Sequence, residues 1–159
     1  MKIDKKKKVG IPARLRKQVT NCTNCKLSTV RRKHCLPVMG RGVMPADILF
    51  IGESLNLSEE IIGSVFVGNS GKLFDKIIED AKLLLEKEIG KSIDTPSYFI
   101  TNIVCCRATN ESCGVNREPL PVEVLACAKN LMSIYKSVEP SAIIFVGKVA
   151  EKYYKKEFR

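Results

Sequence analysis

Tryptophan is absent from the sequence, and histidine occurs once, at His34, in a chain of 159 residues. No run of eighteen apolar residues exists, so the sequence offers no candidate for a membrane-spanning helix. The chain also does not open with a charged segment followed by an apolar one, which is the pattern of a secretory signal. We therefore expect an intracellular protein with no membrane partner.

Acidic residues are scarce at the N-terminal end. Residues 1–41 hold Asp4 as their single acid against thirteen lysines and arginines, whereas residues 42–159 hold fourteen bases and sixteen acids. The net charge of +10 therefore belongs to the N-terminal part, and we call residues 1–20 the basic arm. Clustered positive charge suits phosphate binding, for which the candidates are Arg14, Arg16, Lys17, Arg31, Arg32 and Lys33. A solvated segment that only keeps the protein soluble would explain the charge equally well.

The cysteines number seven, at positions 22, 25, 35, 105, 106, 113 and 127. Their number is odd, and an intracellular chain with 45% hydrophobic residues can bury a stable core without disulfides. Metal ligation is therefore the better interpretation for some of them. Cys35, Cys105 and Cys113 also suit the role of small apolar side chains, because free cysteine is commonly buried.

Apolar runs alternate with helical periodicity along the chain. The apolar runs predict strands over residues 46–52, 97–104 and 141–147. The helical periodicity predicts helices from residue 13 onward and over residues 70–89, 121–138 and 148–158. Ser70 and Gly90 suit the two ends of the second helix. This order predicts an α/β fold, a three-layer sandwich with a central, mainly parallel sheet and helices on both faces. Ligands of such sheets bind beyond the carboxyl ends of the strands.

Cys22 and Cys25 form a C-x-x-C pair, a spacing with which one turn can bind one metal centre. A second pair comes from "CRATNESCGVNREPLPVEVLAC", residues 106–127. Apart from a few extra residues around Cys113, this segment resembles C-R-P-P-x-N-R-x-P-x-x-x-E-x-x-x-C of the family-4 uracil-DNA glycosylases. The matching residues are Cys106, Arg107, Asn116, Arg117, Pro119, Glu123 and Cys127.

Other pieces of the same family occur here in the same order. "ADILFIGE" resembles its strand with the G-E motif, "FVGNSG" resembles F-V-G-x-A-G, and "YFITNIVCCR" resembles Y-I-T-N-V-V-K-C-R. "VGKVA" is similar to its L-G-x-x-A. The resemblance covers residues 21–150, so the chain is identified as a member of that superfamily. We expect residues 21–159 to form one uracil-DNA glycosylase-like domain after the basic arm.

The resemblance implies a [4Fe-4S] cluster bound by Cys22, Cys25, Cys106 and Cys127, with Cys105 as the neighbour that faces the core. Four thiolates suit iron–sulfur chemistry and would join the basic arm to the long loop before Cys127. The alternative is zinc, bound by the same four cysteines or by a local set with His34 and Cys35.

The resemblance also implies a pocket for a base that is flipped out of DNA. Phe66 matches the aromatic side chain that stacks on the base, Asn102 the amide that hydrogen-bonds uracil, and Glu53 a catalytic carboxylate. Exposed amides in the loop of Gly68 and Gly71 could hold a phosphate. Structural roles are the alternatives: core packing for Phe66, bonding at a strand end for Asn102, and a helix-start anion for Glu53.

The sequence departs from the family pattern in two places. The family's G-E-A-P-G reads "GESLN" here, with Leu55 and Asn56 in place of Pro and Gly, so the turn that aims the catalytic group can differ. The family continues to a last strand and an H-P-S loop with a catalytic histidine, whereas this sequence stops at Arg159. We expect slow or no excision by these residues alone, and a protein partner or a second copy over the open sheet edge.

Three functions fit the sequence. The leading expectation is an enzyme that hydrolyses the N-glycosidic bond of uracil in DNA, as in base excision repair. The second is a catalytically inactive DNA-binding or interaction module of a replication or repair assembly. The third is an interaction domain held together by zinc, without affinity for DNA.

Overall fold

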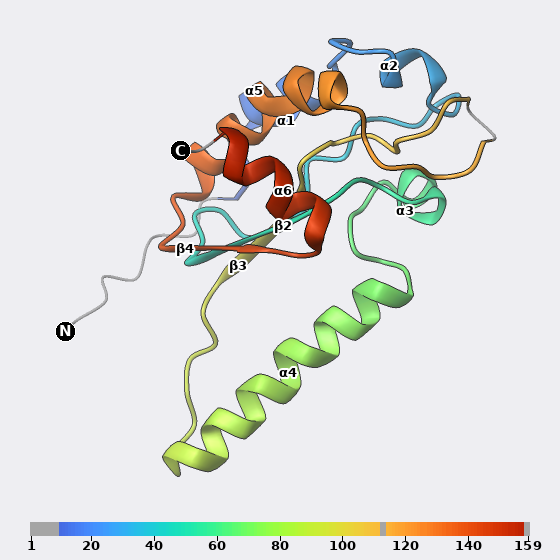
Figure 1. Ribbon diagram of the computed structural model, residues 1–159. Helices are drawn as coiled ribbons and strands as arrows, with labels where there is room; N and C mark the ends of the chain where they lie inside the picture. The colour runs from blue at the N-terminus through green and yellow to red at the C-terminus, as the bar shows by residue number, and fades with distance from the viewer. Residues whose placement is uncertain (1–9, 112–113, 158–159) are drawn as a thin grey trace.

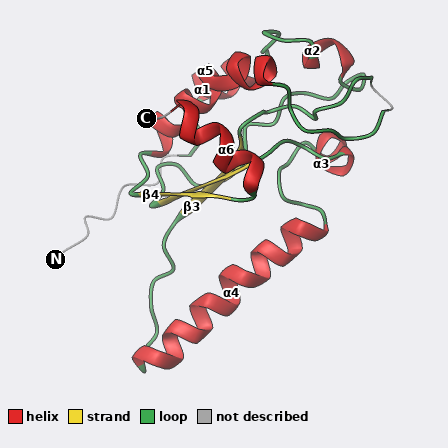
Figure 2. Ribbon diagram, in the orientation of Figure 1, coloured by secondary structure: helices red, strands yellow, loops and turns green. Residues whose placement is uncertain are grey.

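A computed structural model describes residues 10–111 and 114–157 of the chain (Figure 1). Cys113 and the first nine residues of the basic arm lie outside the described residues. Strands and helices alternate as predicted, and they form one open sheet with helices packed on it (Figure 2).

The sheet has four strands in the order β1-β3-β2-β4: β1 (Arg41–Gly42), β2 (Ile48–Gly52), β3 (Tyr98–Asn102) and β4 (Ala142–Phe145). β2 pairs in parallel with β3 and with β4, whereas β1 is antiparallel to β3. Gly52 and Asn102 are register partners, so β2 and β3 end side by side. The three apolar runs therefore form the parallel strands that the sequence predicts.

Six helices are present in the described part of the chain: α1 (Ala13–Thr20), α2 (Leu27–Val30), α3 (Leu57–Ile62), α4 (Asn69–Ile89), α5 (Pro121–Val138) and α6 (Lys148–Glu157). The short helices α2 and α3 were not predicted. None of the helices in the described ranges is long and apolar enough to cross a membrane.

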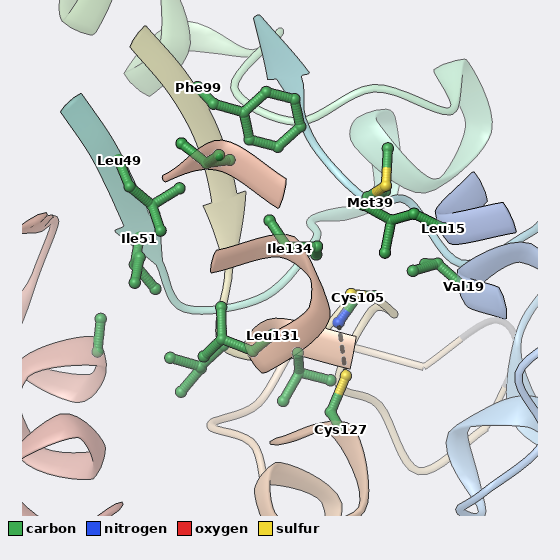
Figure 3. Close-up of a cluster of buried hydrophobic side chains, with 14 of the residues drawn as sticks. Leu15, Val19, Met39, Leu49, Ile51, Phe99, Cys105, Cys127, Leu131 and Ile134 are labelled. Atoms are coloured by element: carbon green, nitrogen blue, oxygen red, sulfur yellow. Dashed lines mark hydrogen bonds between the residues drawn. The ribbon is translucent and has the colours of Figure 1, made fainter. Parts of the chain in front are cut away.

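The main core lies on one face of the sheet. Leu49 and Ile51 of β2 and Phe99 of β3 point into it, where they meet side chains of α1, α5 and α6 (Figure 3). Leu15 and Val19 of α1 are part of this core, so the last turns of the basic arm pack on α5. The boundary between arm and domain near residue 20 stays a prediction.

A smaller core lies on the opposite face, because successive side chains of a strand point to opposite sides. Phe50 and Ile100 pack there with Phe74 from the second turn of α4. The rings of Phe50 and Phe74 meet edge to face with their centroids 4.8 Å apart. Helices thus cover both faces of the sheet, which confirms the predicted three-layer sandwich.

Helix α4 differs from its prediction in two respects. It begins at Asn69 with Gly68 as the N-cap residue, so Ser70 is not the cap, while Gly90 ends it in the left-handed conformation as predicted. Its apolar stripe is also less buried than the spacing predicts, because only the first turns pack on the sheet and the rest extends away from it (Figure 1). Leu73, Ile77 and Leu84 are exposed.

Candidate active site and cysteine cluster

The carboxyl ends of β2 and β3 bring two predicted site residues together around a glycine. A Cβ atom on Gly52 would lie 2.5 Å from Asn102 Oδ1 and 2.9 Å from the ring of Phe66. At such distances a larger residue would have to displace the Asn102 amide or the Phe66 ring, so glycine lets both side chains lie here. Asn102 and Phe66 therefore flank the end of β2, as expected of two residues that share one pocket.

Asn102 has a buried amide with an unused donor. The residue is 1% exposed, and its Nδ2 atom has no hydrogen-bond partner in the described structure. A buried polar group without a partner typically costs about 1–3 kcal/mol, so such groups are rare unless a ligand completes them. The amide is thus positioned to bind a ligand that offers an acceptor.

Phe66 is held in an unfavourable backbone conformation. Its φ is +53°, in the left-handed region that a bulky side chain rarely adopts and that costs about 1–3 kcal/mol. Glu59 Oε1 accepts a hydrogen bond of 2.6 Å from the Phe66 N–H, and Arg41 donates to the carbonyl oxygens of Val65 and Phe66. A Cβ atom on Gly71 would collide with the Phe66 backbone. These contacts fix the ring beside Asn102.

The support for Phe66 comes from residues that the sequence reasoning missed. Asn56 is the N-cap of α3, its Oδ1 accepts from the Glu59 N–H at 2.9 Å, and Glu59 Oε2 accepts from the Asn56 N–H at 3.0 Å. This is a capping box, and its spacing of three residues between Asn56 and Glu59 was a readable signal. Asn56, read above as a departure, thus begins the helix that supports Phe66.

Glu53 follows Gly52 directly, at the same edge of the sheet. Burial raises the pKa of its carboxyl group, and the negative charge of Glu118 raises it further. The backbone oxygen of Glu53 accepts a hydrogen bond of 3.2 Å from the Val104 N–H, which connects the segments that follow β2 and β3. A half-buried carboxyl group with a raised pKa is a typical candidate for a catalytic acid or base.

The four cysteines of the predicted cluster line one small cavity. Cys22 and Cys25 come from the turn after α1, Cys106 from the segment after β3, and Cys127 from α5. Burial, followed by the charge of Cys127, raises the pKa of Cys106 to about 12. The cavity therefore gathers thiols from distant parts of the chain into one donor set.

Cys105 is 1% exposed and packs in the main core, as predicted. Its backbone N–H also donates a hydrogen bond of 3.4 Å to Cys127 Sγ (Figure 3). Hydrogen bonding from the Cys105 side chain is the largest effect on Cys127 and lowers the pKa of that thiol to about 7. Cys105 therefore stabilises the thiolate form that a metal centre requires.

His34 and Cys35 do not join this donor set. They line a different cavity, together with Arg16 and Glu60. Among residues 10–111 and 114–157, no three His, Cys, Asp or Glu side chains are arranged to hold a single metal ion. The local zinc site with His34 and Cys35 thus finds no support in the described geometry.

The basic candidates divide into two groups. Four of them are exposed: Arg14, Arg16 and Lys17 on α1, and Lys33. The other two, Arg31 and Arg32, are half-buried. Arg31 lies close enough to Cys106 for its positive charge to lower the pKa of that thiol. Arg31 therefore adds positive charge to the surroundings of Cys106, and its contact with phosphate stays a prediction.

Comparison with known families identifies the fold. Residues 39–159 match the sequence profile described as "Uracil DNA glycosylase superfamily". The chain belongs to the uracil-DNA glycosylase superfamily. Glu53, Phe66, Asn102, Cys106 and Cys127 all lie within the matched residues.

Three curated relatives of this superfamily member are type-4 uracil-DNA glycosylases. The protein of Saccharolobus solfataricus is 36% identical over 136 residues, which cover 86% of this chain and 55% of the relative. That of Sulfurisphaera tokodaii is 33% identical over 140 residues, 88% of this chain and 56% of the relative. That of Archaeoglobus fulgidus is 29% identical over 137 residues, 86% of this chain and 60% of the relative. The chain thus spans between half and two thirds of the length of these relatives.

In this superfamily member, two matched arginines hold the loop between β3 and α5. Arg107 Nε donates to Glu60 Oε2 at 2.9 Å, and Arg107 Nη1 donates to the Gly114 carbonyl oxygen at 2.7 Å. Arg117 makes two hydrogen bonds, of 2.7 and 2.8 Å, to the carboxylate of Glu123. The arginines therefore stabilise the loop between Cys106 and Cys127, a role that the sequence reasoning did not assign.

Proposed function

We propose that this chain carries the base-binding part of a uracil-DNA glycosylase, which hydrolyses the N-glycosidic bond between uracil and deoxyribose in DNA. The observation that carries the proposal is the buried, unpartnered amide donor of Asn102 beside the strained Phe66. The family assignment and the names of the relatives support the same reaction.

The proposed pocket selects uracil by its hydrogen-bonding edge. Asn102 Nδ2 would donate to the O4 carbonyl of a flipped uracil, and Oδ1 would accept from its N3–H. Cytosine carries an amino group at position 4 and an unprotonated N3, so it places a donor against a donor and an acceptor against an acceptor. The ring of Phe66 would stack on the base.

Glu53 supplies negative charge on the sugar side of the bond. As the bond between C1′ and the base breaks, positive charge develops on the sugar, and an ionised carboxylate stabilises it or orients the attacking water. Water adds to C1′, the base leaves with the bonding electrons, and a proton reaches the base. Because the pKa of Glu53 is raised, its carboxylate becomes protonated on acidification at a higher pH than the carboxylate of an ordinary glutamate does.

Cys22, Cys25, Cys106 and Cys127 would hold a [4Fe-4S] cluster, which would staple the turn after α1 to α5 and to the segment after β3. The donor set fits this group, because four thiols line one cavity. Four ligands of a single zinc ion would have to lie roughly 3.8 Å apart, given a zinc–sulfur distance of about 2.3 Å. The resemblance to the family-4 enzymes favours the cluster, and iron and zinc analysis of the purified protein distinguishes the two.

DNA is the proposed partner, and the compartment that holds DNA is the proposed location. The exposed side chains of Arg14, Arg16, Lys17 and Lys33 are available to phosphates. A phosphate-binding role for Gly68 and Gly71 stays a prediction. Gly71 lies buried in the first turn of α4 against the Phe66 backbone, and not in an exposed loop. β4 lies at the sheet edge with Ile144 43% exposed, and its cover by a partner or a second copy also stays a prediction.

A base-release assay tests the proposed function. The protein, prepared without oxygen, is incubated with single- and double-stranded oligonucleotides that carry one uracil, and alkali then cleaves abasic sites. At most slow uracil-dependent strand cleavage is expected from the wild-type chain, because the family's H-P-S loop is not among these residues, and none is expected from Asn102→Asp. Uracil-dependent binding without base release would instead assign the chain to the DNA-binding role.

A further inference from the structure

Asn130 is a second buried amide with an unused donor. It lies on α5 one turn after Cys127, so both side chains share one face of the helix. The residue is 2% exposed and lines the cysteine cavity. Its Nδ2 atom has no hydrogen-bond partner within the described part of the molecule.

The orientation of this amide is set from the basic arm. Gln18 of α1 donates through Nε2 to Asn130 Oδ1 at 3.1 Å and to Ser133 Oγ at 3.0 Å. Because Gln18 occupies the oxygen, the nitrogen is the end of the amide that is left for the cavity. The reversed amide would place its oxygen against thiolate sulfur, which is electrostatically unfavourable.

The neighbour of this donor is Cys127. The Asn130 amide and the Cys127 sulfur belong to residues one helical turn apart on α5, and both residues line the cysteine cavity. The Cys105 N–H donates to the same sulfur at 3.4 Å. Cys127 thus accepts one hydrogen bond from the segment after β3 and shares its cavity with the unpartnered Asn130 donor of its own helix.

We propose that Asn130 donates a hydrogen bond to the sulfur of Cys127, or to an adjacent sulfide of the bound cluster, and thereby raises the reduction potential of that cluster. The inference rests on the cluster of the proposed function. Hydrogen bonds to the sulfurs stabilise the more negative, reduced state and are one of the main controls of the potential of such clusters. Gln18 acts through Asn130 as a positioning residue.

Two substitutions of Asn130 and one matched control test this role. Both substitutions remove the amide donor at nearly constant side-chain size. Asn130→Leu also removes the acceptor for Gln18, whereas Asn130→Asp keeps an acceptor and adds a negative charge. Ser133→Ala removes the other partner of Gln18 on the same helix, outside the cysteine cavity. The midpoint potential, from dithionite titration followed by EPR, should become more negative in both Asn130 variants, further in Asn130→Asp, and should not move in Ser133→Ala.

A measurement on the wild-type chain tests the same hydrogen bond without relying on variants that could lose the cluster. With ¹⁵N only in the asparagine side-chain amides, pulsed EPR of the reduced cluster should show a weak ¹⁵N coupling. Its absence would overturn the inference, whatever the variants do.

Different results would overturn the cluster and the hydrogen bond from Asn130. Protein that contains no iron overturns both the cluster and the role of Asn130. Iron with unchanged midpoints in all variants overturns only the role of Asn130 and leaves the proposed glycosylase function intact.

Discussion

Glu59 connects the start of α3 to Phe66. One carboxylate oxygen accepts from the Asn56 N–H at 3.0 Å, and the other accepts from the Phe66 N–H at 2.6 Å. The same buried side chain therefore caps a helix and holds the backbone at φ +53°. The conformation of the proposed stacking residue depends on a group that does not itself touch the base.

Replacing Glu59 by alanine should weaken both folding and uracil binding. A hydrogen bond to a charged group contributes about 1.5–3 kcal/mol, and Glu59→Ala removes two of them. Glu59→Gln keeps one acceptor oxygen and should lose less. Urea unfolding and the affinity for a uracil oligonucleotide measure the two effects, with Glu79→Ala on the exposed face of α4 as control. Unchanged affinity in Glu59→Ala would show that Phe66 needs no such support.

Asn102→Asp should damage base selection more than stability. The substitution is nearly isosteric, but it replaces the unused amide donor by a carboxylate that faces the O4 carbonyl of uracil. A lost polar match of this kind costs about 1–3 kcal/mol. Binding or excision of uracil relative to cytosine is the measurement, and thermal unfolding is the control. A variant that still prefers uracil as strongly as the wild type would contradict the role of Asn102.

The sequence predicted the layers of this fold well, because β2, β3 and β4 are apolar runs bounded by helical periodicity. It did not predict β1, since Arg41 and Gly42 carry no strand pattern and pair only because β3 lies beside them. The burial of α4 was overestimated for a related reason. Periodicity shows which side chains share a face, but not whether another element covers that face.

The sequence named the residues of the candidate site, whose roles stay predictions, but it could not give their geometry. The resemblance pointed to Asn102, Phe66 and the four cysteines, and the structure brings each group together. The free donors of Asn102 and Asn130 could not be read from the sequence, because they depend on contacts over long distances along the chain. Gln18, for example, orients Asn130 from a position 112 residues away.

The buried ion pair between Arg107 and Glu60 should be sensitive to the loss of one partner. Both side chains are at most 2% exposed. Removing one partner leaves an uncompensated buried charge, which typically costs about 3–5 kcal/mol. Arg107→Met and Glu60→Gln should therefore each destabilise the protein strongly, while the double variant should lose less than the sum. The exposed pair Lys152–Glu118 is the control and should contribute about 0–1 kcal/mol. Simple additivity of the two single variants in urea unfolding would contradict this coupling.

The pH dependence of excision should report on Glu53. Its carboxyl pKa is raised by burial and by Glu118, and the reaction needs the ionised form. The rate should therefore fall on acidification at a higher pH than an ordinary glutamate would give. Glu118→Gln removes the second cause, lowers the pKa of Glu53 and should move this acidic limb to lower pH. An acidic limb that does not respond to Glu118→Gln would mean that another group controls the rate.

Phosphate binding by α1 should appear in the salt dependence of DNA affinity. Arg14, Arg16 and Lys17 are exposed, whereas Leu15 and Val19 of the same helix are buried in the core, so deletion of the arm would damage folding as well. Replacing the three cations by glutamine removes their charge and keeps the helix.

Each phosphate contact on duplex DNA contributes roughly 0.9 to the slope of log K against log salt. The triple variant should therefore bind more weakly at low salt and show a shallower slope, by up to about 2.7 if all three cations touch phosphates. The matched control replaces three exposed lysines elsewhere on the surface by glutamine, namely Lys87, Lys91 and Lys136. It removes the same amount of positive charge. Equal slopes in the two triple variants would show that α1 adds only general positive charge, because a true contact surface must be distinguishable from lysines elsewhere.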